Sequence, residues 1–200
     1  MSGKDVADSL YTIAHKHVGN GNMLYRIFYY DCHPFDKKMH NPINNHVIDF
    51  KSTPEYKFRK DLLEALKKKR KVALRLGTLK ENKTWGIHPD KIKQLLKGEI
   101  EAKDLQPEDV YVELRQKGID MKIGIDIASM AMKRFVDRIV LISGDSDFVP
   151  AAKLARREGI DFILDPMWAN VDPSLFEHID GLESYIKKPK STKKKSSATT

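Results

Sequence analysis

Residues 139–148, with the sequence IVLISGDSDF, constrain the fold of this chain more than any other segment. An apolar run rich in β-branched residues, typical of a buried strand, stops at a Ser-Gly turn. Asp145 and Asp147 follow, shortly before Pro150, a residue that is well tolerated in the first turn of a helix. In α/β folds, ligands bind beyond the carboxyl ends of the parallel strands. The two carboxylates therefore stand where such a fold places its functional groups.

The remainder of the chain alternates helical and extended patterns, which is typical of a parallel α/β sheet. Apolar residues recur at helical spacing over residues 6–17, 55–69, 89–96, 121–135, 150–158 and 175–186. Strands are expected at residues 23–30, 71–79, 110–114, 139–143 and 160–164. A long polar loop is expected from Asp31 to about Thr53, and Trp85 falls in an excursion between two strands.

Composition bounds the class of protein. The chain has 200 residues, enough for one domain with a real core, and no apolar stretch approaches the ~18 residues of a membrane span. Cys32 is the single cysteine, so no internal disulfide forms and a cytoplasmic protein is the simplest expectation. Six lysines near the C-terminus supply most of the net charge of +8, leaving about +2 for residues 1–186. We expect one folded domain over residues 1–186 and a disordered lysine-rich tail over residues 187–200.

Two basic clusters are candidates for contact with the phosphates of RNA. One lies where a helix should end and a strand begin, and the other lies in the tail: Lys67, Lys68, Lys69, Arg70 and Lys71, then Lys193, Lys194 and Lys195. Each cluster has a structural alternative. The helix dipole favours cations at a helix C-terminus, and a basic tail can serve solubility alone.

Asp126, Asp145 and Asp147 are the residues that we expect to carry the chemistry. Acids gathered at one sheet edge repel one another unless a cation sits between them, and Mg²⁺ or Mn²⁺ takes carboxylate and water oxygens as ligands. Asp120 is a further candidate metal ligand. Alternatives remain: Asp145 or Asp120 can be a helix N-cap. Asp126 can pair with Lys122 on an exposed helix face, which spacing alone favours.

Cys32 shares its loop with three histidines whose spacing matches no recurrent zinc pattern: His33, His40 and His46. No base is identifiable beside Cys32, so a nucleophilic cysteine has no support. Trp85 can stack on a base, although packing or loop anchoring explains it better.

Two segments taken together resemble the NYN family of PIN-like nucleases: KGIDMKIGID at residues 117–126 and SGDSDFVP at residues 143–150. The sequence YYD at residues 29–31 also fits, and the resemblance covers roughly residues 5–186. It implies a Rossmann-like α/β/α sandwich with a mainly parallel sheet, whose clustered acids bind Mg²⁺ or Mn²⁺ and cleave RNA. On the matching positions, Asp126, Asp145 and Asp147 take the metal-binding roles, and Asp120 occupies a further motif position.

One departure from the family pattern concerns the start of the chain. Members usually open with a buried strand that ends in Asp-Gly-x-Asn, whose Asp is a principal metal ligand. No apolar strand precedes the first expected helix here. We therefore expect Met1 to be an internal methionine of a longer natural chain. The alternative is a degenerate, non-catalytic member in which Asp5 or Asp8 is a poor substitute.

The leading interpretation is a metal-dependent ribonuclease in which water attacks an RNA phosphodiester bond at the three aspartates. The alternative is a catalytically impaired RNA-binding or regulatory module on the same scaffold, which the missing strand favours. A phosphatase of the haloacid-dehalogenase type also uses Asp-x-Asp after a strand, but normally on its first strand. A homo-oligomer or a partner protein that completes the sheet remains open.

Overall fold

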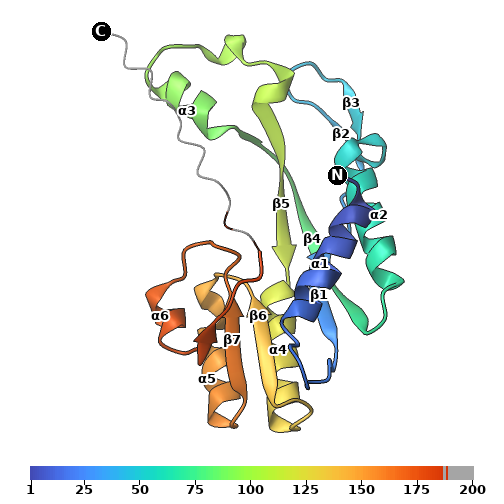
Figure 1. Cartoon of the computed structure of the whole chain (residues 1–200). Coiled ribbons are helices and arrows are strands. Elements are labelled where there is room, and N and C mark those ends of the chain that lie inside the picture. The colour runs from blue at the N-terminus through green and yellow to red at the C-terminus, as the bar shows by residue number, and fades with distance from the viewer. Residues whose placement is uncertain (187, 189–200) are drawn as a thin grey trace. The chain divides into compact units, whose positions relative to one another are not determined.

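The chain divides into two compact units. The computed structural model describes residues 1–186 and 188, and for residues 81–83 it describes the backbone only. Unit 1 contains residues 1–11 and 26–123, and unit 2 contains residues 12–25 and the described residues from 124 onward. Helices α1 (Gly3–Lys16) and α4 (Ile119–Met132) contribute residues to both units (Figure 1).

Unit 1 is built on a sheet with the strand order β1-β4-β5. β1 (Ile27–Cys32) runs parallel to the first part of β4 (Val72–Ile87), and the later part of β4 is antiparallel to β5 (Val110–Lys117). Helix α2 (Pro54–Lys67) packs on this sheet together with α1, as their helical spacing predicted. The buried core that joins them contains Ala7, Leu62 and Leu66, against Tyr29, Val72 and Leu74.

The segment expected to be a long polar loop contains a short hairpin, so that prediction was wrong in part. β2 (Lys38–His40) pairs antiparallel with β3 (Val47–Asp49). Asn41 is buried at the turn, and its side-chain N–H donates to the Pro107 carbonyl O at 2.9 Å. Pairing with a residue so distant in sequence is a tertiary effect that local polarity does not reveal. The short 3-10 helices η1 (Phe50–Ser52), η2 (Ala102–Asp104) and η3 (Pro107–Asp109) complete the loops of unit 1.

β4 is longer than the strand predicted for residues 71–79. It continues through an irregularity between Glu81 and Trp85 and reaches Ile87, with Trp85 opposite Val112 of β5. Helix α3 (Pro89–Leu96) follows, with the predicted bounds. Trp85 therefore belongs to a paired strand. The sequence did not predict this part of the strand, because the residues before Trp85 are polar and lack the apolar pattern of a buried strand.

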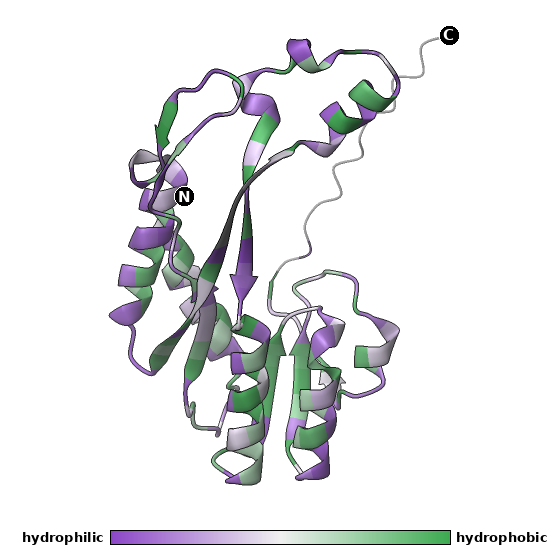
Figure 2. Ribbon diagram, turned by 180° about the vertical axis from the view of Figure 1, so that it is seen from behind, coloured by the Kyte–Doolittle hydropathy of each residue, from purple (hydrophilic) through white to green (hydrophobic). Residues whose placement is uncertain are grey.

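Unit 2 is built on a parallel sheet with the order β6-β7-β8, formed by β6 (Arg138–Ile142), β7 (Asp161–Asp165) and β8 (Gly181–Leu182). Figure 2 shows β6 and β7 as mainly hydrophobic ribbons, which agrees with the apolar runs in the sequence. Helix α5 (Val149–Arg157) joins them and is followed by Gly159, whose φ of 82° is left-handed and suits glycine. Buried core residues of this unit include Leu141, Phe162, Leu164 and Leu175.

The helix predicted for residues 175–186 was wrong. Only α6 (Pro173–Phe176) is helical, and the chain then pairs with β7 as β8. The Asp180 carboxylate accepts a hydrogen bond from the Phe162 N–H at 2.9 Å and another from Arg156 at 2.8 Å. A sheet edge with unpaired backbone groups thus overrides the helical spacing of this segment. The α/β class with mostly parallel pairing is otherwise confirmed. Among the described helices, none combines the length and the hydrophobicity that a membrane span requires.

Two glycines make a matched test of this packing. A Cβ at Gly77 would lie 2.7 Å from Ile119 Cδ1 and 2.9 Å from the Lys117 carbonyl O, whereas a Cβ at Gly124 of α4 would have nothing within 4 Å. We expect Gly77→Ala to lower the free energy of unfolding by about 1–3 kcal/mol. Gly124→Ala should raise it by about 0.5–1 kcal/mol, because alanine loses less entropy in a helix. Urea unfolding measures both, and changes of equal sign and size would contradict the packing described.

Candidate functional site

Asp145 and Asp147 lie on the turn after β6, at the carboxyl end of a parallel strand. Asp145 is the N-cap of the 3-10 helix η4 (Ser146–Phe148), and its Oδ1 accepts a hydrogen bond from the Asp147 N–H at 3.1 Å. The Asp145 N–H in turn donates to the Ser143 hydroxyl at 3.2 Å. Both aspartates are exposed. One acid therefore caps the turn, as the structural alternative predicted, and the second is not needed for that cap.

A second loop, residues 166–170, lies against this turn. A Cβ at Gly144 would be 3.1 Å from the Asn170 carbonyl O, so the two backbones pass close to one another. The second loop follows β7, and Ile142 at the end of β6 stands opposite Asp165 at the end of β7. The carboxyl edge of the unit 2 sheet thus brings together loops from adjacent parallel strands, which is where α/β folds bind ligands.

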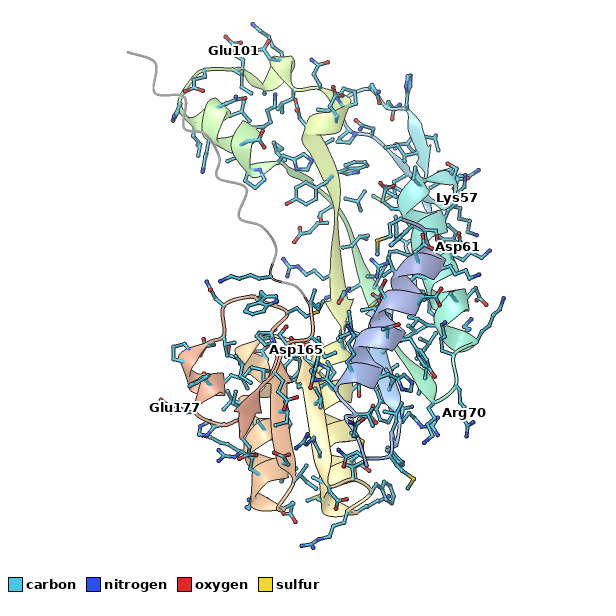
Figure 3. The ribbon with its side chains drawn as sticks, viewed as in Figure 1. Lys57, Asp61, Arg70, Glu101, Asp165 and Glu177 are labelled. Atoms are coloured by element: carbon cyan, nitrogen blue, oxygen red, sulfur yellow. The ribbon has the colours of Figure 1, made fainter. Side chains whose placement is uncertain are left out.

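Asp165 is a residue that the sequence analysis missed. It is fully buried at the end of β7, where Figure 3 labels it. Asp165 Oδ2 lies 2.8 Å from Nε2 of the buried His17, and Oδ1 accepts a hydrogen bond from the Met167 N–H at 2.8 Å. The signal was present, because Asp165 follows an apolar run as Asp145 does, but the predicted strand stopped one residue earlier.

His17 stands between two acids and an aromatic ring. Its Nδ1 is 3.8 Å from Glu183 Oε2 and makes no hydrogen bond within the described residues. The Tyr185 ring meets the imidazole edge-on, with 4.7 Å between the ring centroids. The buried pair of His17 and Asp165 therefore connects the segment after α1 to the carboxyl end of β7.

Asp126 and Asp120 both belong to α4. Asp126 is half-buried in unit 2, and Asp120 is exposed in unit 1. Because α4 begins at Ile119, Asp120 lies inside the first turn, where the helix dipole favours an acid, and is not the N-cap. Across the part of the chain that the structure describes, no three His, Cys, Asp or Glu side chains are grouped to hold a metal ion. Metal binding by these two residues remains a prediction.

In unit 1, the carboxyl end of β1 carries an acid that is already paired. Asp31 forms an ion pair with Arg59 of α2, and its Oδ1 accepts a hydrogen bond from the Cys32 N–H at 2.7 Å. The Tyr29 hydroxyl donates to the other carboxylate oxygen at 3.4 Å, and burial raises the pKa of Tyr29 to about 12, so the phenol stays protonated. Burial also raises the pKa of the Cys32 thiol, which makes it a poor nucleophile.

The basic cluster of residues 67–71 lies at the amino end of β4, whereas Asp31 lies at the carboxyl end of the paired strand β1. Lys67 pairs with Glu64 at 2.6 Å, and Lys69 pairs with Asp8. The cluster is exposed except for the half-buried Lys69, and Figure 3 labels Arg70 beyond the end of α2. Its contact with RNA remains a prediction, and the tail lysines lie outside the described residues: Lys193, Lys194 and Lys195.

The donor set of Asp145 and Asp147 fits a divalent cation. Mg²⁺ is usually bound through one or two carboxylates, with water and substrate phosphates as the other ligands. No described residue donates a hydrogen bond to the Asp147 carboxylate. Asp145 uses only its Oδ1 atom to cap the turn. Two exposed carboxylates one residue apart therefore retain oxygens for a cation that also contacts a phosphate.

The chain matches a known protein-family model. The model of the NYN domain matches residues 15–170, which is more than half of the chain. Comparisons with curated proteins and with solved structures gave no significant match. NYN domains are nuclease-like and related to ribonucleases, and NYN nucleases generally depend on a divalent metal. The chain therefore belongs to the NYN domain family, as the two motif segments predicted.

Proposed function

We propose that the chain is a metal-dependent ribonuclease that hydrolyses phosphodiester bonds of RNA at the carboxyl edge of unit 2. The observation that carries this proposal is the exposed pair of Asp145 and Asp147, held on a capped turn after a parallel strand. Asp126 of the same unit is the third proposed ligand. Metal binding by Asp120 stays a prediction from the sequence. Membership in a nuclease-like family supports the same chemistry.

The residues of the turn have separate roles in this proposal. Asp147 offers its carboxylate to the cation, and Asp145 holds the Asp147 backbone in place through Oδ1 while Oδ2 remains available. A Mg²⁺ or Mn²⁺ ion bound there would polarise a phosphoryl oxygen and lower the pKa of the attacking water. The exposed Lys68 and Arg70, with the lysines of the tail, would attract the RNA backbone without reading its sequence.

Metal removal tests the proposal directly. The purified chain is incubated with labelled single-stranded RNA in Mg²⁺, in Mn²⁺ and in excess EDTA, and the products are separated by gel electrophoresis. We expect cleavage with either metal, none in EDTA, and recovery when metal is added back. The same samples should leave a small phosphomonoester intact. Hydrolysis of the phosphomonoester without RNA cleavage would assign the site to a phosphatase.

A catalytically impaired RNA-binding module is the second candidate function. The observation in its favour is that no group of three potential metal-ligand side chains forms within the described residues. This function predicts RNA binding that weakens steeply with salt, because phosphate contacts release counterions. It also predicts equal binding in Mg²⁺ and in EDTA, with no product in either. Metal-dependent product formation would exclude it.

A further inference from the structure

A tight turn at the carboxyl edge of unit 2 presents two bulky side chains. The Ala169 N–H donates to the Pro166 carbonyl O at 2.8 Å, and the residues between them have left-handed φ values of 49° for Met167 and 67° for Trp168. These are the features of a type I′ turn, for which Asn-Gly is the favoured pair. Residues with a large side chain are strained in this conformation. Such strain persists where the surroundings over-determine it, commonly at ligand sites.

Contacts on both sides of the turn hold the indole of Trp168 in place. The Met167 N–H is anchored on the buried carboxylate of Asp165, which is itself paired with His17. The indole N–H of Trp168 donates to the Ile186 carbonyl O at 2.6 Å. The residue nevertheless remains 46% exposed, and Lys188 Nζ lies 5.6 Å from the ring centroid. A large aromatic ring is thus held in a defined position with much of its surface open to solvent.

The same turn adjoins the proposed nuclease site. The loop that contains Trp168 passes beside Gly144, whose neighbour in the sequence is Asp145. A flat aromatic surface next to the proposed phosphate-binding position matches the chemistry of single-stranded nucleic acid, where bases stack on aromatic rings and cations contact the backbone. We infer that Trp168 is a stacking platform for an RNA base, with Lys188 placed for an adjoining phosphate. This inference rests on the proposed function, because RNA is the substrate that it assumes.

Fluorescence of the single remaining tryptophan tests the inference without any turnover. The chain has two tryptophans, so Trp85→Phe leaves Trp168 as the only indole. This variant is titrated in EDTA with oligoadenylate of about ten nucleotides, the length of a typical single-strand site. Inorganic polyphosphate of similar charge is the comparison. We expect saturable quenching by oligoadenylate and little quenching by polyphosphate. Equal quenching by both ligands would show that charge alone is sensed and would overturn the inference.

Phe135 supplies a matched control in the same unit. It is 51% exposed, has Lys133 Nζ 5.7 Å from its ring centroid, and precedes β6 at the amino end of the strand. Trp168→Ala should weaken oligoadenylate binding, measured by fluorescence anisotropy of a labelled strand, at least about tenfold, and Trp168→Phe less. Phe135→Ala should leave binding unchanged. Equal losses in Trp168→Ala and Phe135→Ala would refute a specific platform.

A combined change of the turn separates binding from folding. Met167→Asn with Trp168→Gly installs the favoured type I′ pair, so this double variant should unfold at higher urea yet bind oligoadenylate at least about tenfold more weakly. Retained affinity would overturn the inference. So would a Trp168 response to anionic phospholipid vesicles but not to oligoadenylate. These binding assays are separate from the cleavage assay, so the two claims can fail independently. Stacking without hydrolysis would contradict only the proposed function. Hydrolysis without stacking would contradict only the inference about Trp168.

Discussion

Asn in place of Asp147 is expected to lower the rate of RNA cleavage by at least about 100-fold while leaving the free energy of unfolding unchanged. The change replaces one carboxylate oxygen by an NH₂ group and removes the negative charge, which weakens the binding of a divalent cation. Folding should not suffer, because Asp147 is exposed and, within the described residues, its carboxylate accepts no hydrogen bond. Single-turnover cleavage of labelled RNA in Mg²⁺ and urea unfolding measure the two effects separately.

Two further aspartates sharpen this test. Asp145→Asn should also lower cleavage, yet it should keep the turn intact, because Asn caps a helix about as well as Asp. Asp137 is exposed and directly precedes β6, at the opposite end of the same strand, and Asp137→Asn should cleave RNA at the unaltered rate. If Asp147→Asn and Asp137→Asn were equally active, the carboxyl edge of unit 2 would not be the site of cleavage.

Ala in place of Asp165 is expected to lower the free energy of unfolding by about 3 kcal/mol or more. Asp165 is fully buried, and it accepts from the Met167 N–H while its second oxygen faces Nε2 of the buried His17. Its removal leaves the buried imidazole of His17 and the Met167 N–H without their partner, and the desolvation cost of the imidazole is not recovered. Urea unfolding followed by circular dichroism gives the loss.

The same strand offers a matched control for that loss. Asp161, at the start of β7, pairs with Arg138 at 2.6 Å, but the two side chains are 37% and 44% exposed. Exposed ion pairs contribute less than about 1 kcal/mol, because water screens the charges in both states. Asp161→Ala should therefore change the free energy of unfolding by less than Asp165→Ala does. Losses of similar size would mean that Asp165 is hydrated and that the pair with His17 contributes little.

Local patterns were sufficient for most of the helices and strands. The apolar run before Asp145 became β6, and the spacing of Leu62, Leu63 and Leu66 became the buried side of α2. Helix α3 has its predicted bounds because it is bordered by Pro89 at its start and Gly98 soon after its end. In each of these segments, the stabilising contacts are either within a few residues or depend only on an apolar face.

The segments that were predicted wrongly depend on partners that are distant in sequence. The hairpin of β2 and β3 is secured through Asn41 and Pro107, and β8 forms because Asp180 meets the edge of β7. Neither contact has a local signature. Taken alone, the sequence of the hairpin favours a polar loop, and the sequence around β8 favours a weakly periodic helix. Both segments form strands when a neighbouring strand offers backbone groups that need hydrogen-bond partners.

Local sequence patterns predicted an α/β protein with two aspartates on a turn after an apolar strand, and two motif segments indicated the NYN family. Apolar strand segments, helical spacing and capping residues depend on neighbours in the sequence, so they can be recognised from the sequence alone. Those patterns did not predict that His17 contacts Asp165 across 148 residues of chain, or that this pair anchors the strained turn that carries Trp168. A buried polar group is stable only beside a hydrogen-bonding partner, and folding brings that partner into reach from a distant part of the sequence.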